Sequence, residues 1–372
     1  MPRSLTGDSL QHYLETRHGS PVTIEEVREL GGDATGSTAL KQFGYGRPLL
    51  VVYRVGERKL EEVFHRLRRN SFGRERDDDR AAAIWLDYHT FNRLPRHVPA
   101  IDMIGYRAGG TIDSLGNVEE FLLVTGFRPG TLYADDLLRI RDEGKGTAQD
   151  VTRAEALAGY LAGIHQQRYD DATWEEGRQA LWQRRLRDLI GHGECIMGLT
   201  DSYPLPLPYV DAEMLRAIEE AANRWRWRLK PLDHRLCQVH GDFHPFNILF
   251  TEDVTLTLLD RSRGEWGEAA DDVSCLSINY LFFSLQRAEA LEPPFKALHQ
   301  RFWERYLELR PDEEMLSAIQ PWFAWRALVL ASPIWYPEIR QETRRRLFTF
   351  ARRVLESERY EWRDVNQYLE VE

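Results

Sequence analysis

The spacing of hydrophobic and polar residues changes about one third of the way along the chain. Before residue 125, the apolar runs are short and several alternate with polar residues, which is typical of strands. The segment Ala81–Leu94 differs, because its apolar residues recur at helical spacing until Pro95. The predicted strands are Val22–Leu30, Ala39–Phe43, Leu49–Val55 and Phe121–Val124.

After residue 130 the helical period dominates. Thr152 and Glu155 have the spacing of a capping box and precede an apolar helix face. Asp211–Trp227 has the pattern of a second amphipathic helix, and residues 273–359 predict several helices rich in Trp, Phe and Leu. The second part of the chain is therefore expected to be mainly helical.

Length and local composition indicate two lobes. A chain of 372 residues exceeds what one hydrophobic core usually serves. Gly and Pro gather in Thr125–Gly130 and predict a linker, whereas the charge-dense residues 57–80 predict an exposed insertion. We expect an α+β protein, with an N-terminal lobe of antiparallel strands and one main helix at residues 1–126 and a larger, mainly helical lobe at 127–372.

Composition excludes several classes of protein. The three cysteines (Cys195, Cys237 and Cys275) are scattered, which predicts a reducing compartment with neither a disulfide framework nor structural zinc. The N-terminus MPRSLTGDSL has no apolar stretch for a signal peptide and no window reaches eighteen apolar residues, so we expect a cytoplasmic protein with no membrane partner. A net charge of −10 argues against nucleic acid as the main ligand.

Residues 240–260, HGDFHPFNILFTEDVTLTLLD, carry the candidate chemistry. They contain Asp242, Asn247 and Asp260 between apolar runs that predict short strands, which would hold the three polar side chains on loops facing one point. A carboxylate can orient and deprotonate a hydroxyl, and amide and carboxylate oxygens are hard ligands that suit Mg²⁺. The spacing therefore favours phosphoryl transfer, with Asp242 as base and Asn247 and Asp260 as metal ligands. Capping of a turn is the alternative for each residue alone.

A glycine-rich segment between two predicted strands offers a second candidate site. Gly31, Gly32, Gly36 and Ser37 would let backbone N–H groups approach the phosphates of a nucleotide closely. The segment is neither a Walker A loop nor a G-x-G-x-x-G fingerprint, so it does not predict a P-loop or Rossmann protein.

His240, Gly241, Asp242, His244, Asn247 and Asp260 together resemble the catalytic loop and metal-binding segment of the aminoglycoside phosphotransferase and choline kinase-like superfamily. That superfamily consists of small-molecule kinases with a protein-kinase-like bilobal fold, and the Asp-to-Asn spacing is also that of the protein-kinase catalytic loop. The resemblance implies that His240 supports the loop and that His244 approaches phosphate or substrate, although a structural role for His244 stays open. Gly267–Val273 resembles the family's G-D-P-x-x-D-L segment, which implies that Asp272 braces the loop or caps a helix.

The resemblance also implies a nucleotide site in the first lobe, for ATP or GTP with Mg²⁺. Arg54 stands on the third predicted strand where the family usually has lysine, and Asp87 is the helix carboxylate expected to pair with it. Leu123 and Thr125 would line the site of the base. Alternatives left open are Lys41 and Lys59 for the cation, and Glu75 and Asp79 for the carboxylate.

We therefore expect a kinase that phosphorylates a hydroxyl of a small molecule resembling an aminoglycoside, choline or a sugar. Glu265, Glu268 and Asp271 are candidate acidic residues for an acceptor pocket, and Trp266 could stack on the acceptor. A non-catalytic nucleotide-binding module on the same fold is the alternative, because Arg54 departs from the usual lysine. A protein kinase is disfavoured by the lack of an A-P-E-like segment after Asp260.

Overall fold

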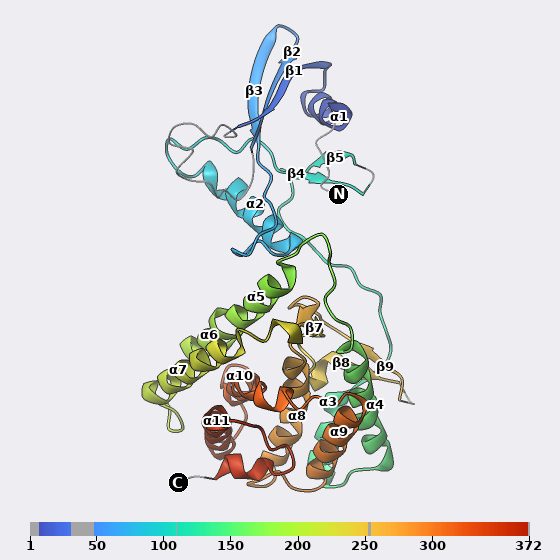
Figure 1. Ribbon diagram of the computed structural model, residues 1–372, viewed down its shortest axis with the longest axis vertical. Helices are drawn as coiled ribbons and strands as arrows, with labels where there is room; N and C mark the ends of the chain where they lie inside the picture. Colours follow the sequence, from blue (N-terminus) through green and yellow to red (C-terminus); the bar gives the residue numbers. More distant parts are fainter. Residues whose placement is uncertain (1–6, 31–47, 109, 252–253, 371–372) are drawn as a thin grey trace. The chain divides into compact units, whose positions relative to one another are not determined.

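The computed structural model describes residues 7–30, 48–108, 110–251 and 254–370 (Figure 1). The chain forms two compact units, Met1–Thr125 and Gly126–Glu372. In the described residues, no helix combines the length and the apolarity that crossing a membrane requires.

A three-stranded antiparallel sheet, in the order β1-β2-β3, forms the centre of the first unit. Leu10, Tyr13 and Leu14 of α1 lie in one buried cluster with Val51 and Tyr53, which alternate along β2 and so share one face of the sheet. The bounds are α1 Gly7–His18, β1 Val22–Glu29, β2 Leu49–Val55, β3 Arg58–Phe64, α2 Asp77–Phe91, β4 Ile104–Tyr106 and β5 Ile112–Ser114.

Two expectations for this unit are wrong. Part of the predicted exposed insertion is strand β3, which pairs with β2. Inward and outward side chains alternate along β3, although many of them are charged. Glu62 points inward and is neutralised by Arg17, with 2.6 Å between Arg17 Nη2 and Glu62 Oε2. Phe121–Val124 forms no strand, and the side chain of Leu123 is 90% exposed. An apolar run becomes a strand only where a neighbouring strand accepts its hydrogen bonds.

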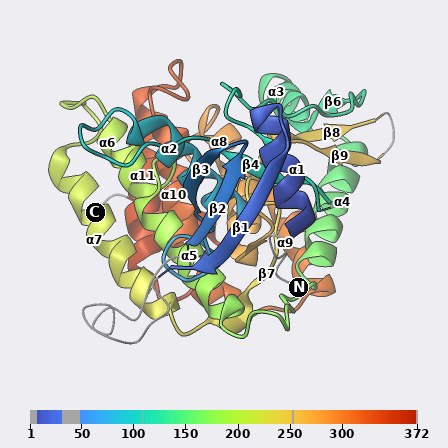
Figure 2. The same ribbon diagram turned by 90° about the horizontal axis from the view of Figure 1, so that it is seen from above.

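Nine helices make up most of the described part of the second unit. Their bounds are α3 Tyr133–Glu143, α4 Ala148–Ile164, α5 Gly177–Gly191, α6 Ile196–Ser202, α7 Ala212–Leu229, α8 Ala269–Leu285, α9 Phe295–Leu309, α10 Gln320–Ala331 and α11 Gln341–Glu356. Every residue of α8 is buried, and α8 contacts α9 and α10. Figures 1 and 2 both show α7 and α4 on opposite sides of this unit, with α8 and α10 between them.

Short strands and 3₁₀ helices connect the helices of the second unit. One sheet has the order β6-β8-β9, and β7 pairs separately with β10. The bounds are β6 Thr131–Leu132, η2 Asp233–Arg235, β7 Cys237–Gln238, η3 Pro245–Asn247, β8 Ile248–Phe250, β9 Leu256–Leu258, β10 Trp266–Gly267, η4 Met315–Ser317 and η5 Val365–Leu369. Asp242 thus lies in the loop between β7 and η3, Asn247 ends η3, and Asp260 follows β9.

The N-cap residues show where two of the predicted helices begin. Asp211 caps α7, where its carboxylate accepts the N–H of Met214 at 2.8 Å. The predicted capping box at Thr152 is wrong, because α4 begins earlier, with Thr147 and Asp150 as the box. The α+β class, with an antiparallel sheet near the N-terminus and a mostly helical remainder, is confirmed.

Candidate active site

The loop after β7 is held by a buried carboxylate. Asp272, in the first turn of α8, accepts the backbone N–H groups of His240 and Gly241, each at 2.7 Å. Gly241 has φ +89°, a conformation that side chains disfavour, so glycine suits this turn. The first turn of α8 therefore fixes the backbone that carries Asp242, which is the bracing role implied by the sequence. Glu268, not Asp272, is the N-cap of α8.

His165 supports this carboxylate from α4. Its Nε2 lies 3.2 Å from Asp272 Oδ2, and its Nδ1 lies 2.8 Å from the hydroxyl of Tyr306. Burial raises the pKa of Asp272, but the bonds from His165 and the His240 backbone outweigh burial and lower that pKa. Asp272 is therefore ionised and fully engaged in support of the loop.

His240 links the loop to the segment that carries Asp260. The Asp242 N–H donates to His240 Nδ1 at 3.3 Å, and His240 Nε2 donates to the carbonyl oxygen of Leu259 at 3.0 Å. Both ring nitrogens are thus occupied by backbone groups, and the ring is buried. This arrangement suits a supporting residue and not a reacting one.

The same segment ties the backbone of Asn247 to the residue before Asp260. The N–H of Leu259 donates to the backbone carbonyl of Asn247 at 2.9 Å, and Asn247 Nδ2 donates to the carbonyl of Asp242 at 3.1 Å. The amide oxygen of Asn247 is therefore left as the group able to bind a cation. Asp260 is exposed and has φ +51°, a conformation that is sparsely populated and that clusters at functional sites.

These two side chains fit a magnesium ion bound together with nucleotide phosphates. Mg²⁺ takes hard oxygen ligands and is commonly held by one or two protein side chains plus phosphate oxygens and water. A neutral amide oxygen and an exposed carboxylate on tied backbone segments meet that requirement. The described residues contain no group of three His, Cys, Asp or Glu that could hold a metal without such help.

The two carboxylate oxygens of Asp242 have different surroundings. Oδ1 lies 2.8 Å from Arg326 Nη1 and 2.9 Å from Arg263 Nη1. Oδ2 has His244 Nε2 at 3.6 Å. Burial raises the pKa of Asp242, but the charges of Arg326 and Arg263 outweigh burial and hold that pKa well below its usual range. Asp242 is thus ionised, with Oδ1 held by arginines and Oδ2 on the side of His244.

His244 is neutral at neutral pH. Burial lowers its pKa, and although Asp242 raises that pKa, Arg326 and Arg263 add to the lowering. His244 Nδ1 accepts the N–H of Phe246 at 3.2 Å, which makes His244 the cap of η3. Nε2 is the ring nitrogen left to face Asp242.

Sequence reasoning missed the arginines around Asp242. Arg326 lies on α10 and bonds Asp271 Oδ1 at 2.7 Å as well as Asp242, and Arg185 of α5 also bonds Asp271. A cation inside an otherwise apolar stretch, as Arg326 is between Trp322 and Tyr336, is the signal that could have identified it.

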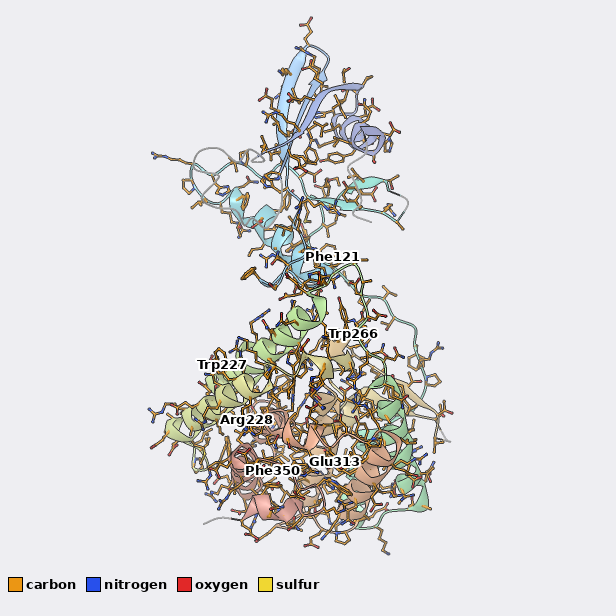
Figure 3. The ribbon with its side chains drawn as sticks, in the orientation of Figure 1. Phe121, Trp227, Arg228, Trp266, Glu313 and Phe350 are labelled. Atoms are coloured by element: carbon orange, nitrogen blue, oxygen red, sulfur yellow. The ribbon has the colours of Figure 1, made fainter. Side chains whose placement is uncertain are left out.

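The proposed acidic acceptor residues need correction. Asp271 is buried between Arg326 and Arg185, and Glu268 is buried against Arg235, with 2.7 Å between Glu268 Oε1 and Arg235 Nη2. Neither carboxylate can meet an acceptor. Glu265 is exposed and accepts the indole N–H of Trp266 at 2.8 Å. Trp266 lies beside α5 (Figure 3) and packs against the core, edge-on to Tyr169.

The described part of the first unit does not form the expected phosphate-binding pair. Arg54 bonds Glu25 of β1, with 2.5 Å between Arg54 Nε and Glu25 Oε1, and the pair with Asp87 is not formed. The fallback cation Lys59 also faces Glu25, and Asp79 belongs to the capping box of α2. Glu25 comes near Arg54 because β1 pairs with β2, a contact that spacing along the sequence does not show.

Two predicted nucleotide-binding residues lie in coil, and others lie outside the described residues. Leu123 and Thr125 lie in exposed coil, so the strand expected to present them is absent from the described residues. Gly31, Gly32, Gly36 and Ser37, together with Lys41 and the predicted strand Ala39–Phe43, lie outside the described residues. Their roles stay predictions.

A cavity of about 230 Å³ lies next to Asp260 within the second unit. Its walls come from α4, from β7 and the residues after it, and from the end of β9 and the residues that follow. The lining residues are Tyr160, Ile164, Gln238, Val239, His240, Leu258, Leu259, Asp260 and Arg261. Asp260 thus borders an open space.

Comparison with solved structures gives distant similarities. The chain is 13% identical to an ethanolamine kinase from Plasmodium vivax, covering 87% of this chain and 78% of that one with a TM-score of 0.35. It is 12% identical to an amicoumacin kinase, covering 92% and 91% with a TM-score of 0.42. For a macrolide 2′-phosphotransferase from Brachybacterium faecium the identity is 14%, the coverage 92% and 96%, and the TM-score 0.29.

Sequence comparison is decisive at the level of the family. No curated protein matches the chain. The family model described as the phosphotransferase enzyme family matches residues 50–311, which include Asp242, Asn247, Asp260 and Asp272. The chain therefore belongs to the phosphotransferase enzyme family.

Proposed function

We propose that this protein transfers the γ-phosphoryl group of Mg-ATP or Mg-GTP to a hydroxyl of a small molecule, such as an aminoglycoside, choline or a sugar. The observation that supports the proposal is that His240 and the Leu259 backbone tie the loop of Asp242 and Asn247 to the segment that carries Asp260. A carboxylate that orients the hydroxyl and side-chain oxygens that hold Mg²⁺ are recurring parts of sites for phosphoryl transfer.

In this proposal Asp242 receives the proton of the acceptor. The hydroxyl would bond to Oδ2, since Oδ1 is engaged by Arg263 and Arg326. The hydroxyl oxygen forms the new bond to phosphorus, the bond from phosphorus to the β-phosphate oxygen breaks, and the proton passes to Asp242. The products are the phosphorylated alcohol and the nucleoside diphosphate.

Because its pKa is low, Asp242 would mainly orient the acceptor hydroxyl and would accept the proton only late in the reaction. Phosphoryl transfer passes through a largely dissociative transition state, in which little proton transfer has to occur early. A weakly basic carboxylate that stays ionised and fixed in direction suits that reaction. Positioning then supplies more of the rate than basicity does.

Asn247 and Asp260 would hold Mg²⁺ on the triphosphate. The bound ion would neutralise charge on the phosphates that develops during transfer. Arg263 contacts Asp242 Oδ1, and its side chain is largely buried. Its guanidinium would add a fixed positive charge near the reacting groups.

A screen for phosphorylated products tests the proposal. Purified protein with Mg-ATP or Mg-GTP would be incubated with aminoglycosides, choline, ethanolamine, amino sugars and hydroxylated amino acids, and mass spectrometry would detect the added phosphoryl group. Transfer to at least one acceptor by the wild type and its loss in Asp242→Asn supports the proposal. If calorimetry shows bound nucleotide but no acceptor gains phosphate, the non-catalytic alternative replaces the proposal.

A further inference from the structure

Arg326 is a buried cation on a helix of the second unit that is almost wholly buried. It lies on α10, where all but one of the twelve residues are buried, and its guanidinium stacks on Trp325 with 3.8 Å from Cζ to the ring centroid. A charge in such a place is costly unless it is paired and hydrogen-bonded. The partners that Arg326 uses therefore indicate what it is for.

Those partners belong to the catalytic loop and to α8. Nη1 donates to Asp242 Oδ1 at 2.8 Å, while Nη2 donates to Asp271 Oδ1 at 2.7 Å and to the backbone carbonyl of Gly241 at 3.3 Å. One planar group thus bonds both the carboxylate of Asp242 and the backbone just before it. These contacts fix the rotation of the carboxylate as well as its position.

A second arginine completes the buried network. Arg185 of α5 bonds the other oxygen of Asp271. Arg185, Asp271, Arg326 and Asp242 thus alternate in charge and join α5, α8 and α10 to the catalytic loop. Arg263 adds a further positive charge at Asp242 Oδ1, and the contacts between opposite charges allow the buried groups to stay ionised.

Stability alone does not account for this network. Buried ion pairs are weak contributors to stability, and well-packed apolar residues often replace them without loss. The network has one asymmetric result, which is that Oδ1 of Asp242 is occupied and Oδ2 remains on the side of His244. That asymmetry suits a carboxylate whose Oδ2 meets the acceptor.

We propose that Arg326 is a positioning residue of the active site, holding Asp242 by Oδ1 together with Arg263 so that Oδ2 is directed at the acceptor hydroxyl, with Asp271 and Arg185 holding Arg326 in turn. This inference rests on the proposed function, in which Asp242 receives the hydroxyl proton. Arg326 does not touch substrate in this scheme. It acts through Asp242.

The test compares Arg326→Lys and Arg326→Gln with a matched buried arginine. Arg344 on α11 is equally buried, but its guanidinium bonds only backbone carbonyls of residues 331–339, so Arg344→Gln is the structural control. For each variant, release of ADP from Mg-ATP, with the acceptor from the screen where one is found, gives kcat and KM over pH. Carbon-13 NMR of labelled aspartate, assigned with Asp242→Asn, gives the pKa of Asp242 in the full chain.

We expect Arg326→Gln to raise the pKa of Asp242 by roughly one to three pH units, because a charge that favours the carboxylate is removed. The same variant should lower kcat by about 100-fold with little change in nucleotide KM, since the carboxylate is misplaced. Arg326→Lys should keep the low pKa yet regain only part of the rate, because an ammonium group cannot bond Asp242, Gly241 and Asp271 in one plane. Arg344→Gln should lower the melting temperature without moving the pKa of Asp242.

Two results would overturn the inference. One is an unchanged pKa of Asp242 in folded Arg326→Gln, and the other is an Arg326→Lys variant with the full wild-type rate. The NMR measurement needs no turnover, so it decides the inference even if the wild type proves inactive. Inactivity of the wild type, or an Asp242→Asn variant as active as the wild type, would instead overturn the proposed function.

Discussion

At the scale of single residues, some side chains of the site support the loop, and a different side chain is placed to react. Asp272 and His240 use their polar atoms to hold backbone, and neither has an atom left for a substrate in the described structure. Asp242 is different, because only one of its oxygens is held. The candidate reacting atom is therefore Asp242 Oδ2.

Asp242→Asn should abolish most turnover while leaving nucleotide binding intact. The amide cannot accept the hydroxyl proton, and general bases contribute about 100- to 10,000-fold to rate. Because Asp242 is ionised far below neutral pH in the wild type, its titration should cause no loss of activity between pH 5 and 8. Steady-state kinetics measures the loss of rate, and calorimetry with Mg-nucleotide checks affinity. Wild-type turnover in the variant would remove Asp242 from its role.

Asp260→Ala should weaken the binding of Mg-nucleotide itself. The side chain is exposed and lies on the segment tied to Asn247, so its loss removes a charged oxygen ligand from the metal. Calorimetric titration with nucleotide in Mg²⁺ and again in EDTA measures this effect, since the variant should gain little from Mg²⁺. Glu265→Ala is the control, because it removes an exposed carboxylate on the same loop that the proposal does not use. Equal affinities for Asp260→Ala and wild type would refute the metal role.

The local part of the site could be predicted, and the distant part could not. Asp242, Asn247 and Asp260 lie within nineteen residues of one another, so their spacing alone suggested a shared function. Arg326 reaches Asp242 from 84 residues away in the sequence. No spacing rule connects the two, because the packing of α10 against α8 brings them together. The burial of Glu268 and Asp271 likewise depends on long-range packing.

At the scale of elements, helices were easier to predict than strands. The cap at Asp211 and the apolar face of α7 are both local features, and the helix follows them. β3 was missed because its inward face carries Glu62, whose neutralising partner Arg17 lies on a helix far away in sequence. Conversely, the apolar run Phe121–Val124 lacks a described partner strand. Strands thus depend on neighbours that the sequence does not identify.

α9 contains a histidine that should make the protein sensitive to acid. His299 is fully buried, and burial lowers its pKa to about 3, whereas an unfolded histidine titrates near 6.5. Between these values the unfolded chain binds the additional proton. The contribution of His299 to the free energy of unfolding should therefore be fully present above about pH 6.5. It should fall as the pH drops toward 3, by up to about 1.4 kcal/mol per pH unit.

Urea denaturation between pH 4 and 8 measures this contribution. His299→Phe removes the titrating group, so its free energy of unfolding should depend less steeply on pH than that of the wild type. His12→Phe changes an exposed histidine and should leave the slope unchanged. A wild-type slope that persists in His299→Phe would show that other groups cause the acid sensitivity.

At the scale of the whole molecule, the two units have cores of different size. The buried cluster of the first unit joins α1 to the sheet through Leu10, Tyr13, Leu14, Val51 and Tyr53, together with Val22 and Ile112. The second unit has a continuous core around α8 that extends through most of its helices. Because stability scales with the apolar area buried, the sheet should open locally at a lower free energy than α8 does.

Hydrogen exchange of the full chain, followed by mass spectrometry, tests this difference. Peptides from β1, β2 and β3 should exchange before peptides from α8. Leu14→Ala, which removes a fully buried side chain of α1, should cost about 2–5 kcal/mol locally and speed exchange in the sheet. The same substitution should leave α8 protected, because α8 belongs to the other cluster. If α8 lost protection together with the sheet, or if both exchanged at one rate in the wild type, the two cores would have to unfold as a single cooperative unit.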